Sequence, residues 1–195
     1  MSTATMALIP VGEYYMRNVM ETASGFRIAE DHTFQFFFSQ GALDRFGEGT
    51  WQLEGDTLVL NSRKRPAHDF ALLQSSKKEG NGIHVQITDN NDLVIRYVQG
   101  TLRGGYVVQQ EVTDETGLIQ FGPQTIDTIE LAFAFCPEKL SVFTVEAKDH
   151  NHFEFRFEPW MMEYFFEDFK IKLLDGELTG PNPMLNGDEF RYEKA

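Results

Sequence analysis

Cysteine and basic residues are both scarce in this sequence. Cys136 is the one cysteine among 195 residues, so no disulfide can form within the chain, and the protein does not depend on an oxidising compartment. No motif around it activates a thiol, and we expect a small buried side chain beside Pro137. The 17 Lys and Arg stand against 30 Asp and Glu, a net charge of −13. This charge argues against nucleic acids and anionic membranes as partners, because both would repel the protein.

Long hydrophobic segments are absent too. No apolar run approaches the ~20 residues that a membrane helix needs. Residues 1–15 show neither the basic region nor the apolar region of a signal peptide, and we expect residues 1–10 to be a loose lead-in. We therefore expect a cytoplasmic protein, or a periplasmic one if a leader has been removed.

Catalytic motifs are a third absence. The sequence has no GxSxG elbow, no HExxH, no P-loop and no GxGxxG, and no carboxylate pair has a spacing that implies acid and base roles. We name no catalytic residue and no cofactor, and we favour a protein that is not an enzyme.

Aromatic residues, in contrast, are plentiful, with 18 Phe in the chain. In the segment 31–62, large apolar residues alternate with polar ones, as in Phe34, Phe36 and Phe38, which predicts strands with one buried face. Phe37 interrupts the polar face, so we expect the second face to be covered there. Four strands joined mainly by short turns are expected from Phe26 to Leu60, with one helical turn over Gln40 to Glu48.

Two further groups of strands follow. Short strands at roughly 8–12-residue spacing between residues 83 and 146 predict a small β-sandwich, with a returning strand over Leu93 to Val98 and a flexible connection over Gly100 to Gly105. From residue 149 the Phe-rich alternation returns, at residues 153–157 and 169–173.

The predicted fold is therefore all-β. We expect a partial or closed antiparallel barrel, or a curved sheet, built from both chain ends (residues 10–75 and 148–195), because neither end has enough strands alone. A small sandwich of transthyretin-like or immunoglobulin-like type, residues 80–147, is inserted between them.

Two resemblances accompany this reading. Residues 83–89 (IHVQITD) and 111–121 (EVTDETGLIQF) resemble the carboxypeptidase regulatory-like modules, which have a transthyretin-like fold and are mostly non-catalytic appendages. Residues 41–44 (GALD) and 49–60 resemble a group of uncharacterised bacterial proteins with a lipocalin-like N-terminal region. Neither resemblance implies an active site.

Two segments carry candidate site residues. Residues 160–169 (WMMEYFFEDF), read as a helix, would have one broad apolar face, which predicts either a plug over the open end of the barrel or a surface that lines a ligand or binds a partner. The candidate ligand- or partner-binding residues are Trp51, Trp160, Met161, Met162, Tyr164, Phe165 and Phe166. Beside Asp149, His150 and His152 would face the same way on a strand, which predicts either two metal ligands or a solvated strand end.

Three functions stay open at this point. The first is a non-enzymatic interaction or scaffold module that presents an apolar patch or an open strand edge to another protein or to a second copy of itself. The second is a carrier that encloses a small apolar ligand inside the curved sheet. The third is a metal-dependent hydrolase built on the two histidines.

Overall fold

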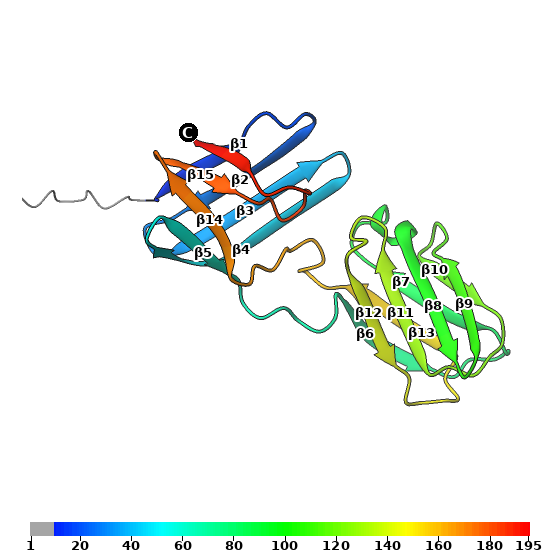
Figure 1. Cartoon of the computed structure of the whole chain (residues 1–195). Helices are drawn as coiled ribbons and strands as arrows, with labels where there is room; N and C mark the ends of the chain where they lie inside the picture. Colours follow the sequence, from blue (N-terminus) through cyan, green and yellow to red (C-terminus); the bar gives the residue numbers. More distant parts are fainter. Residues whose placement is uncertain (1–9) are drawn as a thin grey trace, which may run out of the picture. The chain divides into compact units, whose positions relative to one another are not determined.

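The computed structural model describes residues 10–195, which form strands, turns and one short 3-10 helix, η1 (Val94–Tyr97). The chain divides into two compact units, each drawn in Figure 1. The first comprises the chain up to Arg65 together with Met162–Ala195, and the second is Pro66–Met161. The expected lead-in over residues 1–10 lies, apart from Pro10, outside the described residues. Between residues 10 and 195, no helix is both long and apolar enough to cross a bilayer.

The first unit is a closed antiparallel barrel of eight strands. Each strand pairs with its two neighbours, and β1 pairs with both β2 and β16, which closes the barrel. Of the predicted alternatives, the closed barrel from both chain ends is confirmed. Its strands are β1 (Gly12–Met16), β2 (Thr22–Ile28), β3 (Thr33–Gln40), β4 (Leu43–Glu54), β5 (Thr57–Asn61), β14 (Phe169–Leu174), β15 (Glu177–Gly180) and β16 (Phe190–Lys194).

The barrel closes because both chain ends carry inward-facing apolar rows. Phe34, Phe36 and Phe38 of β3 are buried, while Gln35 and Phe37 between them point outward. An eight-stranded barrel has an interior just wide enough for side chains to fill. Here the filling is largely aromatic, with Tyr14, Met16, Phe26, Ile28, Phe34, Phe36, Phe38, Trp51, Leu58, Leu60, Phe166, Ile171, Leu173, Leu178 and Tyr192 in one buried cluster.

The inserted unit contains two four-stranded sheets. One has the order β10-β7-β13-β6, in which β7 and β13 run parallel, and the other has the order β12-β11-β8-β9. Aromatic contacts join the two sheets, with ring centroids 4.9 Å apart for Phe133 and Phe157 and 4.8 Å apart for Phe143 and Phe155. The strands are β6 (Phe70–Ser76), β7 (Ile83–Thr88), β8 (Val98–Gly104), β9 (Val107–Val112), β10 (Leu118–Phe121), β11 (Thr128–Phe133), β12 (Leu140–Thr144) and β13 (His152–Phe157).

The inserted unit is larger than the expected 80–147. We predicted that β6 and β13 would belong to the barrel, in the case of β13 because the Phe alternation in residues 153–157 matches that of β3. Instead β13 lies between β6 and β7 in the sandwich, so this prediction was wrong for both strands. Alternation predicts that a strand has one buried face, but it carries no information on which sheet the strand joins.

Three local predictions also differ from the structure. The helical turn expected over Gln40 to Glu48 is a tight β3–β4 connection through Gly41, whose φ of 59° suits glycine. The apolar residues of this hairpin have the spacing of a helical turn, and this spacing was the reason for the wrong prediction. The returning strand expected from Leu93 is largely the 3-10 helix η1. The stretch that we expected to be a flexible connection belongs instead to β8, where Gly100 and Gly104 allow close packing.

Candidate functional site

A row of exposed aromatic side chains crosses the outer face of the barrel from β1 to β4. The strand registers place Tyr15 opposite Gly25, Gly25 opposite Phe37, and Phe37 opposite Phe46. Tyr15, Phe37 and Phe46 retain 37%, 39% and 43% exposure. Three large aromatic residues on a solvent-facing sheet surface are unusual, since outward positions of barrel strands are normally polar. We call these three residues the aromatic row.

Gly25 makes room for this row. A Cβ atom at residue 25 would lie 2.8 Å from Cε1 of Phe37, so the Phe37 ring lies directly over the glycine. The Phe37 ring also contacts the Tyr15 ring, with centroids 6.1 Å apart. Glycine at this position therefore lets the Phe37 ring lie close to the sheet and hold a defined position beside its neighbours.

A polar row lies beside the aromatic one. Across the same four strands, the registers place Glu13 opposite Arg27, Arg27 opposite Gln35, and Gln35 opposite Glu48. Glu13 accepts a hydrogen bond of 2.9 Å from the Tyr15 hydroxyl, which raises the pKa of that phenol, and lies 4.0 Å from Arg27. Both rows line a surface groove of about 400 Å³.

The chemistry of the groove suits a cationic side chain. Aromatic ring faces attract Arg and Lys through their quadrupoles, and carboxylates bind the same cations directly. Two carboxylates, Glu13 and Glu48, stand against one guanidinium, Arg27, so the polar row carries a net negative charge. The groove contains no Ser, Cys or His that could act as a nucleophile or base.

The sequence only partly indicated this site. Phe37 was recognised as an interruption of the polar face, but its outer side is exposed rather than covered as we expected. Phe46 was assigned to a helical turn, and Tyr15 to a first strand or irregular edge over residues 11–19. The missing information was the strand register, because it alone determines which outward residues lie next to one another.

The predicted apolar segment 160–169 does not form one site. Trp160 and Met161 belong to the sandwich, whereas Met162 and the residues after it belong to the barrel. The expected helix is absent from this segment, which is extended and irregular. The backbone of residues 162–164 pairs with Phe46, through hydrogen bonds of 3.3 and 2.7 Å, in the part of β4 that β5 does not reach. The helical interpretation was therefore wrong, because apolar spacing over ten residues cannot distinguish a helix from an irregular apolar segment.

Phe166 fills the barrel interior from this segment. It is 3% exposed, and its ring packs against Gly47, where a Cβ atom would lie 2.6 Å from Phe166 Cε2. Its backbone is anchored by Ser62, whose amide donates to the Phe166 carbonyl at 2.8 Å. The segment thus contributes an aromatic plug to the barrel core. Tyr164 and Phe165 precede Phe166 in the chain and are half-buried.

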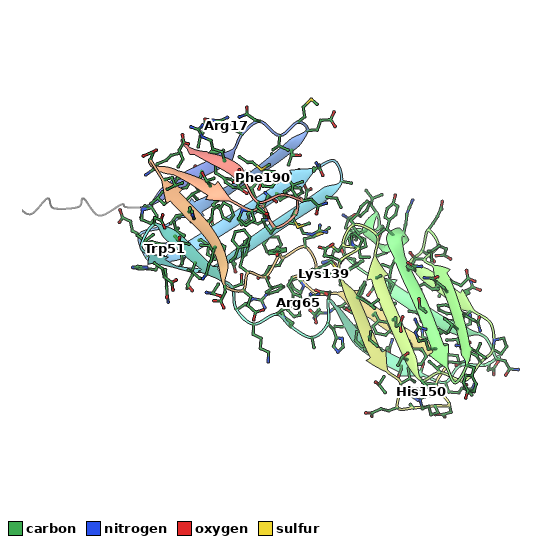
Figure 2. All side chains as sticks on the ribbon, in the orientation of Figure 1. Arg17, Trp51, Arg65, Lys139, His150 and Phe190 are labelled. Carbon is green, nitrogen blue, oxygen red and sulfur yellow. The ribbon has the colours of Figure 1, made fainter. Side chains whose placement is uncertain are left out.

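The two candidate tryptophans, Trp51 and Trp160, each donate a hydrogen bond to a backbone carbonyl of their own unit. The indole of Trp51, labelled in Figure 2, is buried in the barrel, donates to the Ala29 carbonyl at 2.9 Å and stacks on His32. Trp160 is half-buried and donates to the His68 carbonyl at 2.9 Å. Because the core cluster fills the barrel, the structure offers little support for a ligand enclosed beside Trp51.

The two candidate metal ligands do not converge. His150, labelled in Figure 2, precedes β13 and its Nδ1 lies 2.8 Å from the Ser75 hydroxyl. His152 instead lies opposite His84 in the parallel β7–β13 pair, with ring centroids 6.4 Å apart. Burial, followed by the charges of Lys78 and His84, lowers the pKa of His152. No cluster of three or more His, Cys, Asp or Glu that could hold a metal occurs in the described part of the chain.

A comparison with protein families, curated proteins and solved structures finds no match to this chain. The resemblances to transthyretin-like modules and to a lipocalin-like bacterial group stay predictions. Any function must therefore be argued from the site itself.

Proposed function

We propose that this protein is a non-enzymatic interaction module whose barrel binds an Arg- or Lys-bearing segment of another protein in its outer groove. The observation that carries the proposal is the aromatic row of Tyr15, Phe37 and Phe46 beside the carboxylates of Glu13 and Glu48. Exposed aromatic patches with a polar border are typical of protein-binding surfaces.

The size and chemistry of the groove support a short segment as its occupant. A volume of about 400 Å³ accommodates a few side chains. Cation–π contacts contribute about 0.5–1 kcal/mol each when exposed and about 2 when desolvated. A guanidinium over Phe37 or Phe46 with Glu48 at its edge would combine both interactions, and a neighbouring apolar residue would cover Tyr15.

The architecture suits a scaffold. Each unit has its own buried core, so the groove stands on a rigid barrel wall whose interior is already filled. In this proposal the sandwich is a non-catalytic appendage, as its resemblance to regulatory-like modules implies. This role is compatible with a cytoplasmic location, because the one cysteine, Cys136, is buried and requires no oxidising compartment.

The test is selection of peptide ligands from a phage-displayed random library with the full-length chain as bait. We expect enriched peptides to share an Arg or Lys next to an apolar residue. The double variant Phe46→Ser with Glu48→Gln removes one ring and one carboxylate, while the backbone at residue 46 still pairs with residues 162–164. Its affinity for the enriched peptides should fall at least about tenfold, corresponding to about 1.4 kcal/mol.

The matched control is Tyr106→Ser, which removes a fully exposed ring from the sandwich. Its affinity for the same peptides should equal that of the unaltered protein. Enriched peptides without a cationic residue, or peptides that bind the double variant equally well, would refute the proposal.

A further inference from the structure

Strand β9 forms one edge of its sheet, as Figure 1 shows, and is exposed along nearly its whole length. Val107, Val108 and Val112 have exposures of 51%, 53% and 65%. The strand pairs with β8 in continuous register from Gly104 to Gln99, with no bulge. It contains no Lys and no Pro, two residues that commonly protect an open edge from pairing with another strand, and its one charged residue is Glu111.

The direction of the free backbone groups follows from one hydrogen bond. The Thr113 amide donates to the Val98 carbonyl of β8 at 2.9 Å. In an antiparallel pair, successive residues direct their N–H and C=O groups to alternate sides. The backbone groups of Val108, Gln110 and Val112 therefore point away from β8, toward the open edge.

We propose that β9 pairs with β9 of a second copy of this chain, antiparallel and across a two-fold axis at Gln110. In this register Val108 lies opposite Val112 of the partner subunit, Gln110 lies opposite the partner's Gln110, and Val112 lies opposite the partner's Val108. These are the three positions whose backbone groups are directed to the edge, so each pair exchanges backbone hydrogen bonds. The two four-stranded sheets would become one continuous sheet.

Side-chain chemistry selects this register over its neighbours. An axis at Gln110 matches two pairs of valines on the outer face, and it places Glu111 opposite the partner's Gln109, so that no like charges face each other. An axis at Glu111 would place two carboxylates directly opposite. An axis at Gln109 would place each Val108 opposite a glutamine. The strand is thus self-complementary about Gln110, as a two-fold interface requires.

This surface is independent of the barrel groove, and each is tested without the other. The paired strands form a small interface, so we expect a dimer that dissociates on dilution. Sedimentation velocity of the full-length chain should show a mass rising from 22.4 kDa toward twice that value with increasing concentration. A monomer at every concentration would overturn the proposal.

Two double variants test the register. Val108→Glu with Val112→Glu places like charges opposite each other at both outer pairs, and should raise the dimer dissociation constant at least about tenfold. Val108→Glu with Val112→Lys places opposite charges at the same two pairs, and should dimerise like the unaltered protein. Equal dissociation of both variants would overturn the register, and unaltered dimerisation of both would show that the dimer forms elsewhere.

A third variant guards against misfolding of the charged ones. Gln110→Pro removes an N–H that points to the open edge, so it leaves the hydrogen bonds to β8 intact, and proline is tolerated on edge strands. We expect a monomer with an unchanged far-UV circular dichroism spectrum. A Gln110→Pro protein that retains this spectrum and still dimerises would refute pairing through β9.

Discussion

Removing the Phe166 ring should destabilise the barrel more than any change on its outer face. This side chain enters the interior from a segment that belongs to no strand, and it is 3% exposed. It is the common neighbour of the aromatic core, because its ring centroid lies 4.9–6.2 Å from those of Phe26, Phe34, Phe36, Tyr164 and Phe169.

The expected loss for Phe166→Ala is about 3–5 kcal/mol in the free energy of unfolding, the usual range for Phe→Ala in a core. The upper half of that range applies, since edge-to-face aromatic pairs each add about 0.5–1.5 kcal/mol beyond area burial. The backbone around residue 166 is held by Ser62 on both sides, through its amide and its hydroxyl, so the site has little freedom to collapse.

This loss is measured by urea unfolding, monitored through the fluorescence of Trp51. All variants carry Trp160→Phe as well, so that the fluorescence reports the barrel alone. The matched control is Phe37→Ala, which removes the same ring from a 39% exposed position and should cost about 1 kcal/mol. Benzene should stabilise the Phe166→Ala protein and not the unaltered one, because only the variant has an apolar cavity. A loss no greater than that of Phe37→Ala, or benzene binding to the unaltered barrel, would refute the filled interior.

Two further changes test polar groups. Burial lowers the pKa of His152 below the usual 6.5, so the unfolded state binds more protons than the folded state. The contribution of His152 to the free energy of unfolding should therefore be complete above about pH 6.5, and it should be lost as the pH falls toward the lower pKa of the folded state. Urea unfolding between about pH 5 and 8 should show a weaker dependence for His152→Gln, and an unchanged slope would contradict the reasoning. The Asn182 amide nitrogen donates to the buried hydroxyls of Ser24 and Tyr192 at 3.0 and 3.1 Å, and its oxygen accepts from the Met184 amide. Asn182→Leu removes these three bonds and should lower the free energy of unfolding by about 1–3 kcal/mol, measured by thermal unfolding. A neutral Asn182→Leu variant would show that water replaces these bonds.

The candidate site was less predictable than the strands that carry it. Phe37 was visible in the sequence as an apolar residue on a polar face, yet nothing local showed that Tyr15 and Phe46 lie beside it. Those neighbours come from β1 and β4, and their positions depend on two strand registers. A register depends on turn lengths and on the whole buried face, so it is not encoded in any single stretch.

The sequence by itself determined the all-β class, most of the strands and the use of both chain ends for a barrel, because period-two alternation is a local property of the chain. It did not determine the assignment of β13, whose phenylalanines alternate like those of β3 but pack inside the sandwich. Nor did it determine the conformation of residues 160–169 or the cross-strand neighbours of Phe37. Only the tertiary structure decided these, since sheet membership and cross-strand neighbours depend on contacts between residues far apart in the chain.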